Sequence, residues 1–109
     1  MTRIDIGKEF SDVPAGRFPE DGEFNGEKFR KTVLVPALNK GGNVEVILDN
    51  TEGFGSSFLE EAFGGLIRKE GFAKHDILLR LHLVAETTRA LRYKRIAEKF
   101  IADAVPERE

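Results

Sequence analysis

Hydrophobic and polar residues alternate in three short segments, which we interpret as strands: 3–6, 44–49 and 77–84. In the last of them, "ILLRLHLV", an extended chain would place four apolar side chains on one face and two polar ones on the other. These are Ile77, Leu79, Leu81 and Leu83 against Arg80 and His82. A parallel sheet covered on both faces would be apolar throughout, so we expect helices mainly on one face.

Between and after these strands the apolar positions recur with the period of a helix. The first helix is expected from about Gly26, with Asn25 as its N-cap and Pro36 forcing a kink or an early stop. The second is expected over 57–70 and the third over 89–104. The order strand, helix, strand, helix, strand, helix predicts an α/β fold with a small sheet of mostly parallel strands.

The segment 7–26 shows neither period and contains mainly proline, glycine, acidic residues and scattered phenylalanines. A loop of this length is uncommon inside a small domain, and it is functional, mobile or an unrecognised hairpin. One alternative is a short extra strand over 16–18. The pattern leaves the role of this segment open.

Composition narrows the class of protein. With 109 residues we expect a single domain, 1–109, and 40 % hydrophobic with 33 % charged residues suits a globular protein. No apolar run is long enough to cross a bilayer, the N-terminus lacks a signal-peptide layout, and there is no cysteine, so we expect a cytoplasmic protein. Because 17 basic residues nearly balance 19 acidic ones, broad attraction to nucleic acid or a membrane is not expected.

Two adjacent serines stand where the second strand gives way to a helix, in "ILDNTEGFGSSFLEEAFGGL". Ser57 with Glu60 three residues later has the spacing of a capping box, which leaves Ser56 unexplained. At helical spacing Glu61 and Gly64 align with Ser57, away from the apolar stripe. Glycine in an exposed helix costs stability, so this face predicts close approach of another backbone, or packing of an internal loop.

The same turn does not match a nucleotide site. It begins as Gly-x-Gly, but Phe58 replaces the third glycine of a dinucleotide fingerprint, and no Gly-Lys-Ser/Thr follows. Four carboxylates nearby in sequence oppose a bound phosphate: Asp49, Glu52, Glu60 and Glu61. We therefore expect no cofactor. A phosphate attached covalently to a serine here would disrupt a docked surface, as a switch requires.

A family resemblance is carried by this turn, "LDNTEGFGSSFLEEAFGGL", and by the preceding "GRFPEDGEFNGEKFRKTVLVPAL". Over roughly Ile4 to Ala104 the chain resembles the bacterial STAS-like domains of unknown function, relatives of the sulphate transporter and anti-sigma factor antagonist (STAS) superfamily. The resemblance implies three to five mostly parallel strands with helices mainly on one face. In anti-sigma factor antagonists the turn reads Asp-Ser-Ser-Gly, and a kinase that is itself the anti-sigma factor phosphorylates the second serine. That serine matches Ser57, and Ser56 matches the first, whereas Gly55 and Phe58 replace the aspartate and the glycine.

Other constellations are weaker. The residue types of a serine hydrolase are supplied by Ser57, His82 and Asp49, but the nucleophile motif GxSxG is missing. Neither histidine has metal-ligand spacing, so we expect no metal site. A basic stripe runs along the third helix: Arg92, Arg95 and Lys99. It is typical of a solvated face, with an acidic partner or nucleic acid as the second interpretation.

We therefore predict a non-enzymatic regulatory domain that binds another protein. The expected binding surface comprises Gly55, Ser56, Ser57, Glu60, Glu61 and Gly64, with Ser57 and then Ser56 as phosphorylation candidates. The resemblance implies a kinase-like ATPase or an anti-sigma-type factor as the partner. Two alternatives stay open: a small hydrolase or transferase that uses Ser57, and a purely structural homodimer formed through the polar sheet face with Arg80 and His82.

Overall fold

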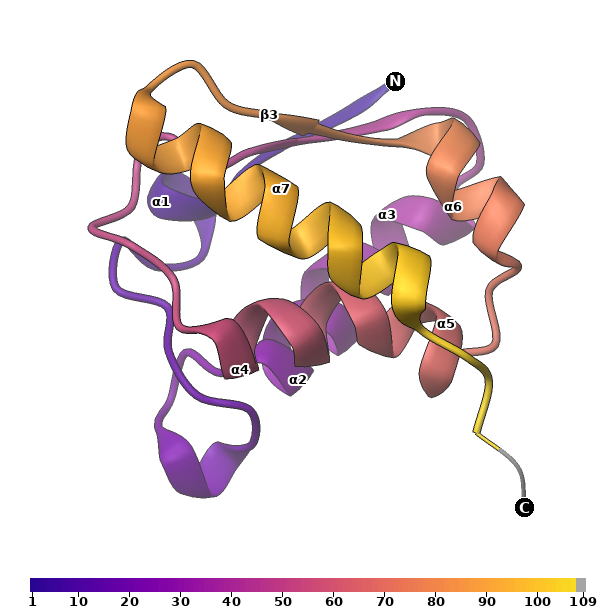
Figure 1. Ribbon diagram of the computed structural model, residues 1–109, viewed down its shortest axis with the longest axis horizontal. Helices are drawn as coiled ribbons and strands as arrows, with labels where there is room; N and C mark the ends of the chain where they lie inside the picture. Colours follow the sequence, from indigo (N-terminus) through magenta and orange to yellow (C-terminus); the bar gives the residue numbers. More distant parts are fainter. Residues whose placement is uncertain (108–109) are drawn as a thin grey trace.

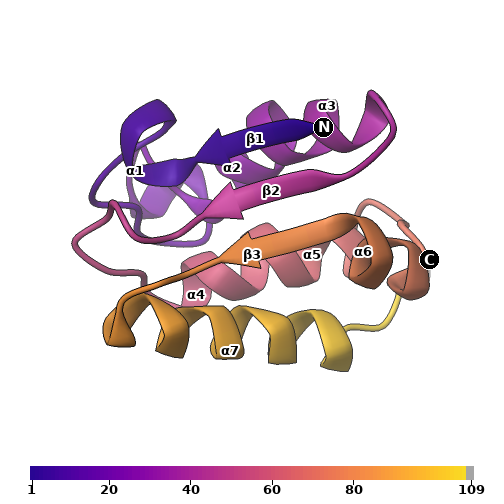
Figure 2. The ribbon, with the colours of Figure 1, turned by 90° about the horizontal axis from the view of Figure 1, so that it is seen from above.

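Three parallel strands form one sheet in the order β1-β2-β3. The computed structural model describes residues 1–107. The strands are β1 (Thr2–Asp5), β2 (Val44–Ile47) and β3 (Leu81–Val84), and all three run in the same direction (Figure 2). The prediction of a small parallel α/β sheet is confirmed. β1 has the expected length but begins and ends one residue earlier, so that Ile6 already belongs to a helix, and β2 ends at Ile47 rather than at Asp49.

The helices lie beneath one face of this sheet, and the other face is left open (Figures 1 and 2). Side chains alternate accordingly: Ile4, Val46 and Leu83 are buried against the helices, whereas Arg3 and His82 are exposed on the open face. The expectation of helices mainly on one face is therefore confirmed. In chain order the helical elements are α1 (Ile6–Glu9), η1 (Pro19–Asp21), α2 (Gly26–Phe29), η2 (Arg30–Leu34), α3 (Val35–Asn39), α4 (Ser56–Leu59), η3 (Glu60–Gly64), α5 (Gly65–Arg68), α6 (Lys74–Arg80) and α7 (Thr88–Asp103).

Two of the helices are continuous over several of these elements, because a π-helical segment lies in the middle of each. The first runs from Gly26 to Asn39 through η2, and the second from Ser56 to Arg68 through η3. Asn25 caps the first as predicted, since its side chain accepts a 2.8 Å hydrogen bond from the amide of Lys28. The early stop at Pro36 is wrong: this proline lies inside the continuous helix, directly after the π-helical segment, which interrupts the regular backbone hydrogen-bond ladder where proline has no N–H to donate.

The predicted third strand over 77–84 is wrong in its first half, because Lys74–Arg80 forms the helix α6. Ile77 points into the core, but Leu79, expected beside it on the buried face, is 71 % exposed. The neighbouring strand β2 has only four residues, each paired with one residue of β3. Additional strand residues before Leu81 would have no partner for their backbone groups, whereas a helix satisfies them internally.

The long segment between β1 and α2 is held against the helices rather than standing free. It contains α1 and the 3-10 turn η1, and the extra strand considered at 16–18 is not formed in the described part of the chain. Phe10 packs edge-to-face on Phe24 and Phe29, with ring centroids 5.5 and 5.0 Å apart. None of the helices within residues 1–107 is long and apolar enough to span a membrane.

Ile77 and Leu79 provide a test of whether Lys74–Arg80 forms a helix rather than the first half of a strand. Ile77→Ala should lower the free energy of unfolding by about 2–5 kcal/mol, because it leaves a cavity in the core. Leu79→Ala should change it by less than about 0.5 kcal/mol, because the side chain is already in solvent. Urea denaturation followed by circular dichroism measures both. Equal, large losses would instead support a strand with both side chains buried.

Candidate functional site

The serine turn, Gly55–Ser57, begins the helix that follows β2. Gly55 is the N-cap, and Ser56 and Ser57 occupy the first helical turn with both side chains exposed. The predicted capping box is wrong: within residues 1–107 no side chain caps this helix. Glu60 instead binds the guanidinium groups of Arg17 and Arg68, the latter at 2.7 Å. The carboxylate of Glu60 is therefore held by two guanidinium groups rather than by a backbone amide at the start of the helix.

Glu61 lies one residue further on and is fully buried, with 0 % exposure. Its carboxylate accepts a 2.6 Å hydrogen bond from Arg30, which is itself buried, and a 3.1 Å bond from Arg17. Arg30 also donates to the backbone carbonyl of Glu61 at 2.6 Å and to the carboxylate of Glu70 at 2.8 Å. Burial raises the pKa of Glu61, but the hydrogen bonds from Arg30 and Arg17 outweigh it and hold this pKa at about 2.

Gly64 and Gly65, further along the same helix, face the interior and leave room for the side chains of Glu60 and Arg30. A side chain at Gly65 would collide with the guanidinium of Arg30, and one at Gly64 would lie 2.8 Å from the carboxylate of Glu60 and 3.5 Å from the carbonyl of Phe100 in α7. Both glycines are buried. Gly64 therefore packs against the backbone of α7 and Gly65 against the side chain of Arg30, and the other explanation considered, packing of an internal loop, is wrong.

The expected binding surface thus divides into two parts. Gly55, Ser56 and Ser57 are exposed, whereas Glu61 and Gly64 are buried, so their placement on an open face was wrong. Glu60 is partly buried and shared between Arg17 and Arg68. The negative potential expected around the serines is correspondingly weaker, because Arg17 and Arg30 from other segments and Arg68 from the same helix neutralise the two glutamates.

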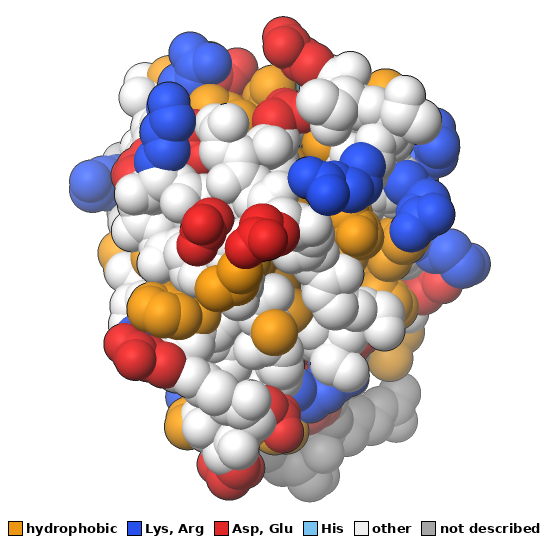
Figure 3. Space-filling view, turned by 90° about the vertical axis from the view of Figure 1, so that its left-hand side faces the viewer, with side chains coloured by type: hydrophobic (Ala, Val, Ile, Leu, Met, Phe, Trp, Pro, Cys, Tyr) orange, Lys and Arg blue, Asp and Glu red, His pale blue; other side chains and the backbone are white. Residues whose placement is uncertain are grey.

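A shallow apolar groove of about 350 Å³ adjoins the serine turn. It lies between the segment 7–26 and α7, and the side chain of Val13 at its rim is 52 % exposed. Tyr93 of α7 forms one wall, with its ring centroid 5.3 Å from that of Phe54. Figure 3 shows this end of the molecule, where apolar side chains lie beside acidic ones. The lining residues are Val13, Pro14, Ala15, Glu52, Gly53, Phe54, Gly55 and Tyr93.

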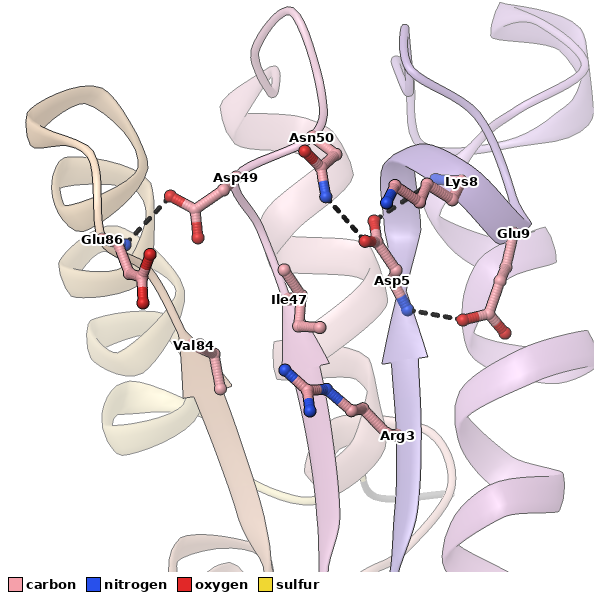
Figure 4. A pocket seen from close by; sticks show the side chains of 9 residues that line it. All are labelled: Arg3, Asp5, Lys8, Glu9, Ile47, Asp49, Asn50, Val84 and Glu86. Carbon is pink, nitrogen blue, oxygen red and sulfur yellow. Dashed lines mark hydrogen bonds between the residues drawn. The ribbon is translucent and has the colours of Figure 1, made fainter.

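A second depression, of about 540 Å³, lies on the open sheet face at the carboxyl ends of the strands (Figure 4). Ligands of open α/β sheets often bind at such ends. Here, however, the carboxylates serve the fold: Asp5 accepts from Asn50 at 2.6 Å and from the amide of Lys8 at 3.3 Å, and Glu9 accepts from the amide of Asp5 at 2.8 Å. The carboxylates of Asp5 and Glu9 therefore have hydrogen-bond partners within the domain.

Asp49, at the same edge, joins the end of β2 to the start of α7. Its carboxylate accepts hydrogen bonds from the amides of Glu86 and Thr87, at 2.9 and 3.0 Å. Burial raises the pKa of Asp49, but these amides and the hydroxyl of Thr87 lower it below its usual value. The carboxylate is therefore a structural acceptor between two loops.

The residues of the hydrolase alternative are not brought together. His82 Nε2 lies 3.4 Å from Asn43 Oδ1, near the amino end of the sheet, while Asp49 binds the loop at the carboxyl end. Ser57 is on the helix that follows. Arg80, expected beside His82, belongs to α6 and donates to the carbonyls of Gly42 and Leu38. Among residues 1–107 no group of acidic and histidine side chains could hold a metal ion.

Together, the one-sided parallel sheet and the exposed serine turn define an α/β domain of STAS-like type. The family model described as STAS-like domain of unknown function (DUF4325) matches residues 25–87, more than half of the chain, and the protein belongs to this family. The matched region runs from the cap of α2 to the loop before α7 and includes the serine turn. Searches of curated proteins and of solved structures gave no match.

The buried ion pair predicts a large effect of a small change. Glu61→Gln should lower the free energy of unfolding by on the order of 3 kcal/mol, because it leaves the buried guanidinium of Arg30 short of a counter-charge. The matched control, Glu27→Gln, removes only the exposed pair with Lys31 and should cost less than about 1 kcal/mol. Chemical denaturation at neutral pH measures both, and equal losses would contradict a special role for the buried pair.

The lowered pKa of Glu61 predicts an acid-sensitive fold. The carboxyl has a pKa of about 2 in the folded protein against an ordinary 4.5, so its contribution is complete above about pH 4.5 and is lost as the pH falls toward 2. That contribution is about 3 kcal/mol. Denaturation curves recorded between these pH values should converge for the wild type and Glu61→Gln as the pH falls. A constant difference between the two proteins would show that Glu61 does not carry the effect.

Proposed function

We propose that this domain is a non-enzymatic regulatory module that binds another protein at the serine turn and the adjoining groove. The single observation that carries the proposal is the exposure of Ser56 and Ser57 at the start of a helix whose following residues are buried. The apolar groove beside them offers an anchor for a partner side chain.

We further propose that phosphorylation of Ser57, or of Ser56, controls this binding. Phosphate in the first turn of a helix is favoured by the helix dipole, so the modification would leave the fold intact. It would nevertheless add about two negative charges next to Gly55, at a groove that is already lined by the exposed Glu52, and repel a partner docked there. The family resemblance supports a kinase-like ATPase or an anti-sigma-type factor as the partner.

Site-directed crosslinking in the native host tests both parts of this proposal. A photoreactive amino acid at Val13, on the rim of the groove, should yield a discrete adduct with one protein. Ser57→Asp should reduce that adduct by on the order of tenfold, because of its added charge. The uncharged, nearly isosteric Ser57→Asn should retain it. The adduct is measured on gels and identified by mass spectrometry.

A photoreactive residue at Glu45, on the open sheet face, is the positional control. An equal adduct from this position would contradict binding at the serine turn. Equal adducts from the aspartate and asparagine variants would contradict the charge switch while leaving the binding surface in place. Covalent labelling of Ser57 by a serine-directed phosphonate would support the hydrolase alternative instead.

A further inference from the structure

The first half of α7 carries three exposed arginines on its outer side. Arg89, Arg92 and Arg95, with Thr88, line a depression of about 440 Å³, and we call these three side chains the arginine patch. Within residues 1–107 none of the three forms an ion pair, whereas Lys99 further along α7 pairs with Asp103 at 3.0 Å. Figure 3 shows basic side chains gathered on the side of this face where α7 lies.

This arrangement is unfavourable for the isolated domain. Residues three apart on a helix are neighbours, so Arg89 repels Arg92, and Arg92 repels Arg95. Arg89 also lies in the first turn of α7, where the positive end of the helix dipole disfavours a cation. A counter-charge supplied from outside the chain would relieve both effects.

Two of the arginines are already held in place. Arg89 donates a 3.1 Å hydrogen bond to the carbonyl of Thr51, and the guanidinium of Arg92 lies 5.8 Å from the centre of the Tyr93 ring. A side chain that is restrained before binding loses less entropy when it binds. The planar guanidinium group also pairs with a carboxylate through two parallel hydrogen bonds.

The arginine patch is continuous with the candidate binding surface. Arg89 contacts Thr51 in the turn that leads to the serines, and Tyr93, beneath Arg92, forms a wall of the apolar groove. One partner could therefore cover the groove, the serine turn and the arginine patch together. A partner that is acidic at this place would also be repelled by phosphate on Ser57.

We propose that the arginine patch docks an acidic segment of the partner protein, with carboxylates paired to Arg92 and Arg95. This inference rests on the proposed function only in that the partner is a protein. Nucleic acid is a less suitable ligand than an acidic protein segment. Its negative charges continue along the whole polynucleotide, whereas the arginine patch spans only about 9 Å of helix. A polynucleotide that extended beyond the patch would meet the exposed carboxylate of Glu98 at one end and that of Glu86 at the other.

Nuclear magnetic resonance titration of the full chain tests this surface. The probe is a synthetic amphipathic helical peptide rich in glutamate, added at near-physiological salt, and the amide shifts should centre on 88–96. The double variant Arg92→Glu with Arg95→Glu should weaken binding at least about tenfold. Arg3→Glu reverses the charge of an exposed arginine in the edge strand β1, outside the arginine patch, and should leave the affinity for the peptide unchanged. Circular dichroism confirms that each variant is folded.

Three outcomes would overturn the inference. These are shifts scattered over all basic side chains, an equal loss of affinity in Arg3→Glu, and tighter binding of a single-stranded DNA oligonucleotide at the same amides. Crosslinking at Val13 tests binding at the serine turn, whereas this titration tests the arginine patch, so the two results are independent. Loss of peptide binding with a normal Val13 adduct would reject only the acidic contact. Normal peptide binding without any adduct would reject only the serine turn.

Discussion

The arrangement of the helices depends on the buried ion pair between Arg30 and Glu61. Each residue belongs to the π-helical segment of one long helix, so the pair ties the two helices together beneath the sheet. Arg17, in the segment 7–26, pairs with the same carboxylate of Glu61 and thereby links that segment to the two helices. A buried charge without a partner is costly, so the three segments must fold together for any of these groups to be satisfied.

This constraint also determines what the site can present to a partner. Because Glu61 and Gly64 face the interior, only the first turn of the helix after β2 is fully exposed, and Glu60 and Arg68 are partly exposed. The surface that remains is small and combines two hydroxyls with an apolar groove.

Much of the fold could be predicted from local patterns. Alternation identified β1 and β2, the helical period identified both long helices, and Asn25 was recognised as a cap from its position alone. The first half of the third strand could not be predicted, because residues 77–80 are apolar enough for either a strand or a helix. The choice depended on the length of β2, a partner distant in sequence.

The sequence by itself determined the class of fold, the family and the exposure of the two serines, because these follow from periodicity and from short motifs. Only the tertiary structure decided which charged side chains are buried. Helical spacing placed Glu61 on the polar side of its helix. Arg68 and Lys69, near the end of the same helix, lie 3.4 and 3.5 Å from its carboxylate, but the buried counter-charge comes from elsewhere. Its partner Arg30 lies thirty-one residues earlier and meets it only when the helices pack. Burial of a charge depends on such distant pairing, which hydrophobic patterns do not encode.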